Sequence, residues 1–204
     1  MKQPRIVVFD VGNVLVDWNP RYLYRTIFPD DSAKMEWFLG NICTGSWNLE
    51  QDRGRSFKQA ANELSQAHPE HQAAIHAFDL RWHETISGEI TGTVEILAKL
   101  RQAGTPNYAI TNFNQDKFRE TKLRFPFLDG FKGTIVSGDE RVVKPDAAIY
   151  ELLLSRYSLD AADCIFIDDS LKNVEGARAV GMHAHHFETP DKLTKELRGF
   201  GFAA

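Results

Sequence analysis

Short apolar runs that end in polar residues restrict the folds that this chain can adopt. The first run, residues 5–9, is rich in β-branched residues and is typical of a buried strand. Similar runs occur late in the sequence, at residues 108–111, 134–136, 164–167 and, more weakly, 182–187. Apolar residues at helical spacing separate these late runs. This alternation predicts an α/β fold with a parallel sheet covered by helices on both faces.

The segment between the first run and the later ones, residues 18–88, breaks this alternation. It contains no convincing strand, but it carries several helix signals. Ser56 and Gln59 form a capping box ahead of an apolar helical face, and Pro69 is suited to the first turn of another helix. The sequence therefore predicts a helical insertion after the first strand.

Composition argues against several classes of function. The net charge of −4 over 204 residues and the lack of a basic run argue against nucleic-acid binding. No apolar run is long enough to cross a membrane, and the first residues lack the apolar stretch of a signal peptide. The two cysteines, Cys43 and Cys164, are far apart, which favours a reduced, cytoplasmic protein.

Polar residues at the ends of the predicted strands are the candidates for a functional site. Asp10 follows the first strand, Thr111 and Asn112 end the second, and Asp168 and Asp169 end the run that begins at residue 164. Open parallel sheets bind ligands beyond the carboxyl ends of their strands. These side chains are therefore expected at one edge of the sheet.

A further candidate is Lys144, which precedes a helix that Pro145 is expected to open. Its ammonium group would supply the positive charge that an attack by Asp10 on a phosphate requires. A lone aspartate, a Thr-Asn pair or a Lys-Pro pair is usually ordinary turn or cap chemistry. The Asp-Asp pair is more informative, because adjacent carboxylates repel each other and favour a cation.

Together these residues have the chemistry of a phosphate site. Asp10 can attack phosphorus and form an acyl phosphate. The carboxylates of Asp10, Asp168 and Asp169 are hard oxygen ligands suited to Mg²⁺. Thr111 and Asn112 can donate hydrogen bonds to the phosphoryl oxygens.

These motifs resemble those of the haloacid dehalogenase-like hydrolase superfamily. The resemblance covers nearly the whole chain, and the matching segments are residues 9–15, 110–112, 144–146, 166–170 and 173–177. It implies a Rossmann-like catalytic core formed by residues 1–17 and 89–204, with an α-helical cap at residues 18–88. It also implies a Mg²⁺-dependent phosphatase whose partner is a small-molecule phosphate ester. Whether the protein is a monomer or a homodimer is left open.

The resemblance also implies a role for each motif residue. Asp10 matches the nucleophile and a metal ligand, Thr111 the phosphate-binding hydroxyl residue, and Lys144 the charge-balancing lysine. Asp169 matches the direct metal ligand of the last motif, and Asp168 matches its partner.

Gly12 is the main departure from the family pattern. Phosphatases of this family usually carry an aspartate there that serves as general acid and base, whereas the metal uses only the main-chain carbonyl. General acid–base catalysis contributes about 10²–10⁴-fold, so its loss must be compensated. The sequence around Gly12 resembles a bacterial branch that includes a sugar-1-phosphate phosphatase. A sugar 1-phosphate, with its phosphate on the anomeric carbon, has a better leaving group than an alkyl phosphate.

Four other residues are candidates for contact with the substrate. Trp47 and Arg53 lie in a segment that looks toward the active site in the similar branch, but cap packing and surface exposure are equally open. Asn114 is a candidate for substrate binding or for a helix cap. Trp82 is suited to cover the site, although core packing is the stronger expectation.

Two other functions compete with phosphatase activity. A metal-independent 2-haloacid dehalogenase would use the same Asp10, but such enzymes have lost the paired acids that Asp168 and Asp169 retain here. A catalytically weak binding module would explain Gly12, but it would not explain why nucleophile, lysine and metal acids all remain.

Overall fold

Five parallel strands form the central sheet. The computed structural model describes residues 3–204. The sheet has the order β5-β4-β1-β6-β7, and every neighbouring pair is parallel. Its strands are β1 Ile6–Phe9, β4 Asn107–Thr111, β5 Gly133–Val136, β6 Cys164–Asp168 and β7 His183–His186. The predicted α/β class and parallel sheet are confirmed.

Strand β1 lies at the centre of this sheet, between β4 and β6. Phe9, its last residue, pairs with Ala109 of β4 and with Ile167 of β6. The carboxyl ends of these three strands therefore lie side by side at one edge of the sheet, as the sequence predicted for its polar residues.

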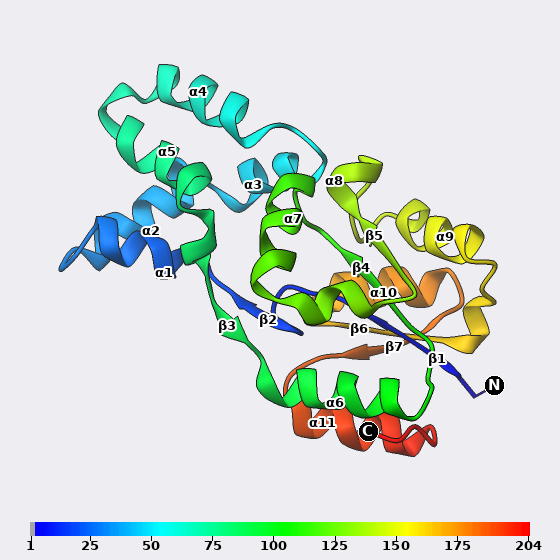
Figure 1. The fold of residues 1–204 in the computed structure, drawn as a ribbon. Helices are drawn as coiled ribbons and strands as arrows, with labels where there is room; N and C mark the ends of the chain where they lie inside the picture. Colours follow the sequence, from blue (N-terminus) through cyan, green and yellow to red (C-terminus); the bar gives the residue numbers. More distant parts are fainter. Residues whose placement is uncertain (1–2) are drawn as a thin grey trace.

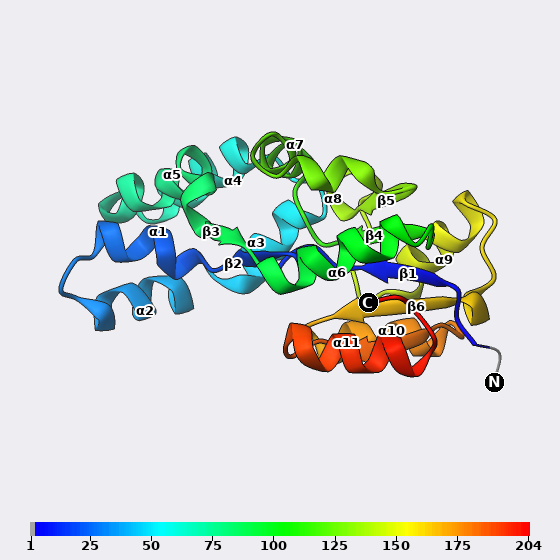
Figure 2. The same cartoon turned by 60° about the horizontal axis from the view of Figure 1, so that its bottom comes forward.

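Helices cover both faces of the sheet (Figures 1 and 2). They are α6 Thr91–Gln102 and α11 Pro190–Gly199 on one face, and α9 Ala147–Arg156 and α10 Leu171–Ala179 on the other. Side chains alternate in direction along a strand. Accordingly, Val7 and Phe9 pack in the apolar cluster beneath α6 and α11, whereas Val8 packs in the cluster beneath α9 and α10.

Short helices complete the core around the edge of the sheet. They are α7 Gln115–Arg124, η3 Pro126–Gly130, α8 Ser137–Glu140 and η4 Ala161–Asp163. One expected helix start is wrong, because α9 begins at Ala147 and not at Pro145. The Lys144–Pro145 peptide bond is cis and lies in the turn before that helix.

An antiparallel two-stranded ribbon, β2 Val16–Trp18 paired with β3 Ile86–Glu89, leads out of the core and back. Between its strands lie α1 Pro20–Ile27, α2 Ser32–Asn41, α3 Gly45–Asp52, α4 Phe57–Ala67, η1 Pro69–His71, α5 Gln72–Leu80 and η2 Trp82–Thr85. We call residues 19–85 the helical segment. Figure 1 shows it extending beyond one end of the sheet, so the predicted helical insertion is confirmed. The boundaries expected at residues 18 and 88 fall within the ribbon.

Aromatic rings pack against one another in the helical segment, within the same apolar cluster that lies beneath α6 and α11. The rings of Tyr24 and Phe38 lie 5.0 Å apart, and Phe57 lies 5.7 Å from Phe78 and 5.2 Å from Trp82. Burial of rings of this size supplies much of the energy that stabilises a small helical unit. One of these rings, that of Trp82, also packs against Phe113 of the core at 5.9 Å.

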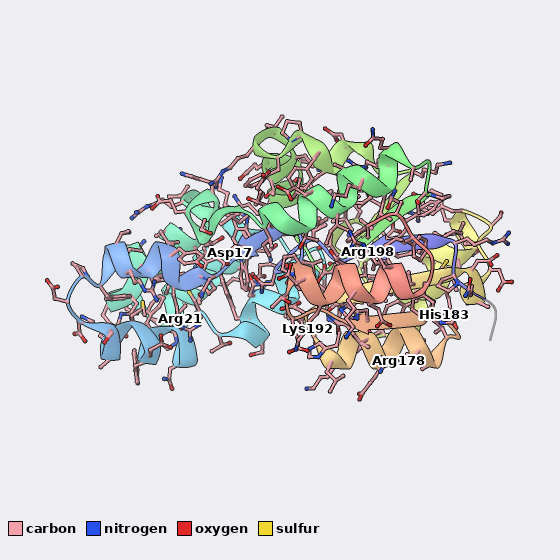
Figure 3. All side chains as sticks on the ribbon, turned by 90° about the horizontal axis from the view of Figure 1, so that it is seen from below. Asp17, Arg21, Arg178, His183, Lys192 and Arg198 are labelled. Atoms are coloured by element: carbon pink, nitrogen blue, oxygen red, sulfur yellow. The ribbon has the colours of Figure 1, made fainter. Side chains whose placement is uncertain are left out.

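Asp17, labelled in Figure 3, ties the ribbon to the first helix of the segment. Its carboxylate accepts hydrogen bonds from the hydroxyl groups of Tyr22 (2.7 Å) and Ser87 (2.6 Å).

Within residues 3–204, no helix combines the length and the apolar character needed to span a bilayer.

Candidate active site

Lys144 is the centre of a buried ion-pair network at the carboxyl edge of the sheet. Its ammonium nitrogen lies 2.7 Å from Asp10 Oδ1 and 2.7 Å from Asp168 Oδ2, and it donates to the carbonyl oxygen of Ile110 at 3.1 Å. Burial opposes the charge on Lys144, but Asp10 and Asp168 outweigh it and raise the pKa of the lysine. The structure therefore brings together Asp10, Lys144 and Asp168, which lie far apart in the sequence.

The two carboxylates of this network are held in fixed orientations. Asp10 Oδ1 accepts a hydrogen bond from the backbone amide of Val11 at 2.7 Å. Asp168 Oδ1 accepts from the amide of Ser170 at 2.8 Å and from Asn173 Nδ2 at 2.9 Å. Such supporting contacts limit the motion of side chains that must be placed accurately for chemistry.

Three carboxylates at this edge could hold a divalent cation. Ligand atoms of Asp10, Asp168 and Asp169 lie within 4.8 Å of one another. Burial raises the pKa of Asp10 to about 8, although the charge of Lys144 opposes this shift. The pKa of Asp169 is also raised, mainly by partial burial and to a smaller extent by the negative charge of Asp168. A cation among these oxygens would offset their repulsion, and Mg²⁺ prefers such ligands. The residues present therefore fit a magnesium site.

Thr111 and Asn112 have different surroundings at the end of β4. Thr111 Oγ1 is buried and has no hydrogen-bond partner among residues 3–204, as suits a hydroxyl group that binds a ligand. The Asn112 side chain accepts from Lys144 N at 2.8 Å and donates to Lys144 O at 3.0 Å. Asn112 thus fixes the backbone of the lysine.

A cavity of about 190 Å³ opens above these groups. It is lined by Asp10, Gly12, Asn13, Trp18, Asn48, Asp52, Trp82, Asn112, Phe113 and Asp169. The sequence predicted Asp10, Gly12, Asn112 and Asp169 at this site. The predicted residues Thr111, Lys144 and Asp168 are buried at the same edge of the sheet but do not line the cavity. The sequence also suggested that Trp82 could cover the site, and this ring is both buried and part of the lining.

The sequence did not predict five of the lining residues as parts of the site: Asn13, Trp18, Asn48, Asp52 and Phe113. Asn48 and Asp52 are four residues apart on α3, so they share one face of that helix. This spacing is the signal that could have identified them. Burial raises the pKa of Asp52 to about 7, against the opposing effects of the Asn114 backbone N–H and of Lys144.

Trp47 and Arg53 flank this face without lining the cavity. The Trp47 indole packs at 6.1 Å from the Phe57 ring and 5.5 Å from the Phe78 ring, so the cap-packing alternative describes it. One residue on a helix turns the side chain by about 100°, which explains why Asn48 faces the cavity and Trp47 faces away. The half-exposed Arg53 lies 3.6 Å from the carboxylate of Asp146 in the core.

Asn114 has the helix-cap role that the sequence left open. Its Oδ1 accepts from the amides of Asp116 (3.1 Å) and Lys117 (3.3 Å) at the start of α7. Its Nδ2 donates to the carbonyl oxygens of Gln51 (3.1 Å) and Arg55 (3.2 Å) in the helical segment. Asn114 therefore joins the helical segment to the core and does not line the cavity.

Comparison with known proteins establishes the family. Residues 4–181 match the haloacid dehalogenase-like hydrolase family, and the chain belongs to that family. Sesquiterpene phosphatase astK of Aspergillus oryzae is 27% identical over 206 residues, covering 95% of this chain and 95% of the relative.

Two solved structures share the fold at low sequence identity. A HAD family enzyme from Bacteroides thetaiotaomicron, in complex with magnesium and inorganic phosphate, matches with TM-score 0.71 and 18% identity, covering 91% of this chain and 95% of that one. L-2-haloacid dehalogenase from Xanthobacter autotrophicus, with chloropropionic acid covalently bound, matches with TM-score 0.65 and 18% identity, covering 98% and 84%. At these identities, the likeness shows the fold alone.

Proposed function

We propose that this protein is a Mg²⁺-dependent phosphatase of small phosphorylated metabolites that acts through an aspartyl-phosphate intermediate on Asp10. The observation that carries this proposal is the meeting of Asp10, Lys144 and the Asp168–Asp169 pair at one edge of the sheet, where Asp10 and Asp169 line the cavity. The names of astK and of the magnesium and phosphate complex from Bacteroides agree with this chemistry.

The contacts of the Asp10 carboxylate suit a nucleophile. One Asp10 oxygen is fixed by Lys144 and by the Val11 amide, which supports the other oxygen as the nucleophile. Lys144 and the hydroxyl group of Thr111 would neutralise and bind the phosphoryl oxygens as charge develops on them. Asp10, Asp169, the Gly12 carbonyl and Asp168 would hold Mg²⁺, which supplies further positive charge to the phosphoryl group.

We further propose that residues 18–88 act as the cap over a core of residues 1–17 and 89–204. Trp18 of β2 and Trp82 of η2 contribute aromatic surface to the cavity, and Asn48 contributes an amide. Such a mixed lining supports a small substrate with both apolar and hydroxylated surface, such as a sugar 1-phosphate. Its better leaving group would lessen the demand for a proton donor.

Competing activities are separated by one set of assays on the 204-residue chain. Phosphate release from glucose 1-phosphate, glucose 6-phosphate and p-nitrophenyl phosphate is measured beside chloride release from 2-chloropropionate, with Mg²⁺ or with EDTA. We expect phosphate release that needs Mg²⁺ and is faster with glucose 1-phosphate than with glucose 6-phosphate.

Three outcomes would contradict parts of this proposal. Chloride release that EDTA does not inhibit would indicate a dehalogenase. Binding of beryllium fluoride without turnover of any substrate would indicate a binding module. Equal rates with the two glucose phosphates would contradict the sugar-1-phosphate preference alone.

A further inference from the structure

The position of Gly12 leaves open space in the cavity where a proton donor is required. A Cβ atom built on Gly12 would have no heavy atom within 4 Å beyond its chain neighbours. The glycine is therefore not imposed by close packing. An alkoxide leaving from phosphorus still needs a proton, and water must later lose one. Another group that reaches this cavity must carry both protons.

Asp52 is a cavity carboxylate that does not belong to the metal cluster. The carboxylates in the cavity lining are those of Asp10, Asp52 and Asp169, within the part of the chain that the structure describes. Asp10 and Asp169 share the cation-binding group with Asp168, whereas Asp52 stands outside it. Asp52 enters from the last turn of α3, on the side of the cavity formed by the helical segment.

The end of α3 is anchored to the core, so Asp52 has a fixed position although it belongs to the helical segment. Ser137 Oγ donates to the Asp52 carbonyl oxygen at 2.6 Å. Asn114 Nδ2 donates to the carbonyl oxygens on either side, at Gln51 and Arg55. Catalytic groups need such placement, because small displacements are costly in rate.

The immediate surroundings of Asp52 suit a group that gains and loses a proton. Only 7% of the residue is exposed, and Oδ2 accepts a hydrogen bond from Asn48 Nδ2 at 3.1 Å. Asn48 Oδ1 is buried without a partner among residues 3–204, so the same amide also has an acceptor to offer a protonated carboxyl group. With a pKa raised to about 7 by burial, both forms of Asp52 are populated near neutral pH.

Building on the proposed phosphatase function, we propose that Asp52 is the general acid and general base that replaces the aspartate absent at position 12. In the first step, Asp10 forms a bond to phosphorus, the bond from phosphorus to the ester oxygen breaks, and Asp52 gives its proton to that oxygen to release the alcohol. In the second step, ionised Asp52 takes a proton from water while the water oxygen bonds to phosphorus. The Asp10–phosphorus bond breaks, and inorganic phosphate leaves.

Dependence on the leaving group tests this role. p-Nitrophenolate leaves without a proton, whereas a simple alkoxide does not. Asp52→Asn should therefore lower turnover of an alkyl phosphate such as glucose 6-phosphate by about 10²–10⁴-fold. With p-nitrophenyl phosphate it should keep a rapid burst of one equivalent of product, followed by slow turnover as water attack becomes limiting. The matched control is Glu50→Gln, which removes a carboxylate from the same helix outside the cavity and should leave both reactions unchanged.

The outcomes separate this inference from the proposed function. Wild-type protein that releases no phosphate would overturn both. Active wild-type protein with Asp52→Asn turning over the alkyl phosphate at nearly the same rate would overturn the role of Asp52 alone, as would equal losses in the burst and in alkyl phosphate turnover. If Asp52→Asn does not fold by circular dichroism, Asp52→Glu, which keeps the carboxyl group, allows the same comparison between burst and turnover.

Discussion

The two sides of the cavity are built in different ways. On the core side, Asp10, Lys144 and Asp168 follow or face the ends of adjacent strands and are joined by ion pairs at 2.7 Å. On the side of the helical segment, Asn48 and Asp52 project from one short helix whose end is joined to the core by polar contacts.

The two sides of the cavity therefore depend on different contacts for their geometry. The core side is tied together by charge and by the sheet, so its geometry depends little on the helical segment. The other side depends on how α3 docks, because its contacts with Asn114 and Ser137 are what place Asp52. Changes on the core side should therefore remove the reaction, whereas changes on the helical side should alter its proton transfers and the coupling of the two parts.

The largest effect is expected from Asp10→Asn on the core side. The neutral amide is a poor nucleophile, so phosphate release should fall by more than about 10³-fold while the fold is kept. Steady-state phosphate release and a circular dichroism melt measure the two effects. Substantial remaining turnover in a folded variant would count against covalent catalysis by Asp10.

A smaller effect, on stability, is expected from Asp52 on the helical side. Burial raises its pKa from 3.8 to about 7, so the folded chain holds a proton that the unfolded chain releases between these values. The free energy of unfolding should therefore fall as the pH rises from about 4 to 7, by up to about 4 kcal/mol for three pH units. Urea unfolding in EDTA measures this slope.

Asp52→Asn serves as the comparison for that slope. The amide does not titrate, so the variant should lose less stability than the wild type over the same pH interval. The carboxylates of Asp10 and Asp169 titrate in both proteins, and the difference between the slopes therefore isolates Asp52. Identical slopes would show that Asp52 is not a group with a raised pKa.

The smallest effect is expected at the joint between the two sides. Asn114→Ala removes a helix cap and two hydrogen bonds to the helical segment, which should lower the free energy of unfolding by about 2 kcal/mol. Urea unfolding measures this loss. Asp31→Ala removes only the cap of α2 and should cost about 1 kcal/mol. Equal losses would mean that the contacts of Asn114 with the helical segment contribute nothing.

Sequence alone predicted the core side well, for a physical reason. The carboxyl ends of all strands in a parallel sheet lie at one edge, so Asp10, Thr111 and the Asp168–Asp169 pair were expected there together. Helical spacing of apolar residues likewise predicted the helical insertion, and the Ser56–Gln59 pair predicted the helix cap, where Ser56 Oγ accepts from the Gln59 backbone N–H. Pro145 was misplaced as a helix start because a proline is equally suited to a turn.

The residues of α3 that line the cavity could not be predicted from the sequence alone. Sequence indicated the right segment but selected Trp47 and Arg53, whereas the cavity takes Asn48 and Asp52. Neighbouring residues in the sequence do not fix the rotation of α3 about its own axis. That rotation depends on which side chains pack into an apolar cluster, here the rings around Trp47. The sequence thus determined the chemistry at the strand ends, and packing between distant elements determined which residues face it.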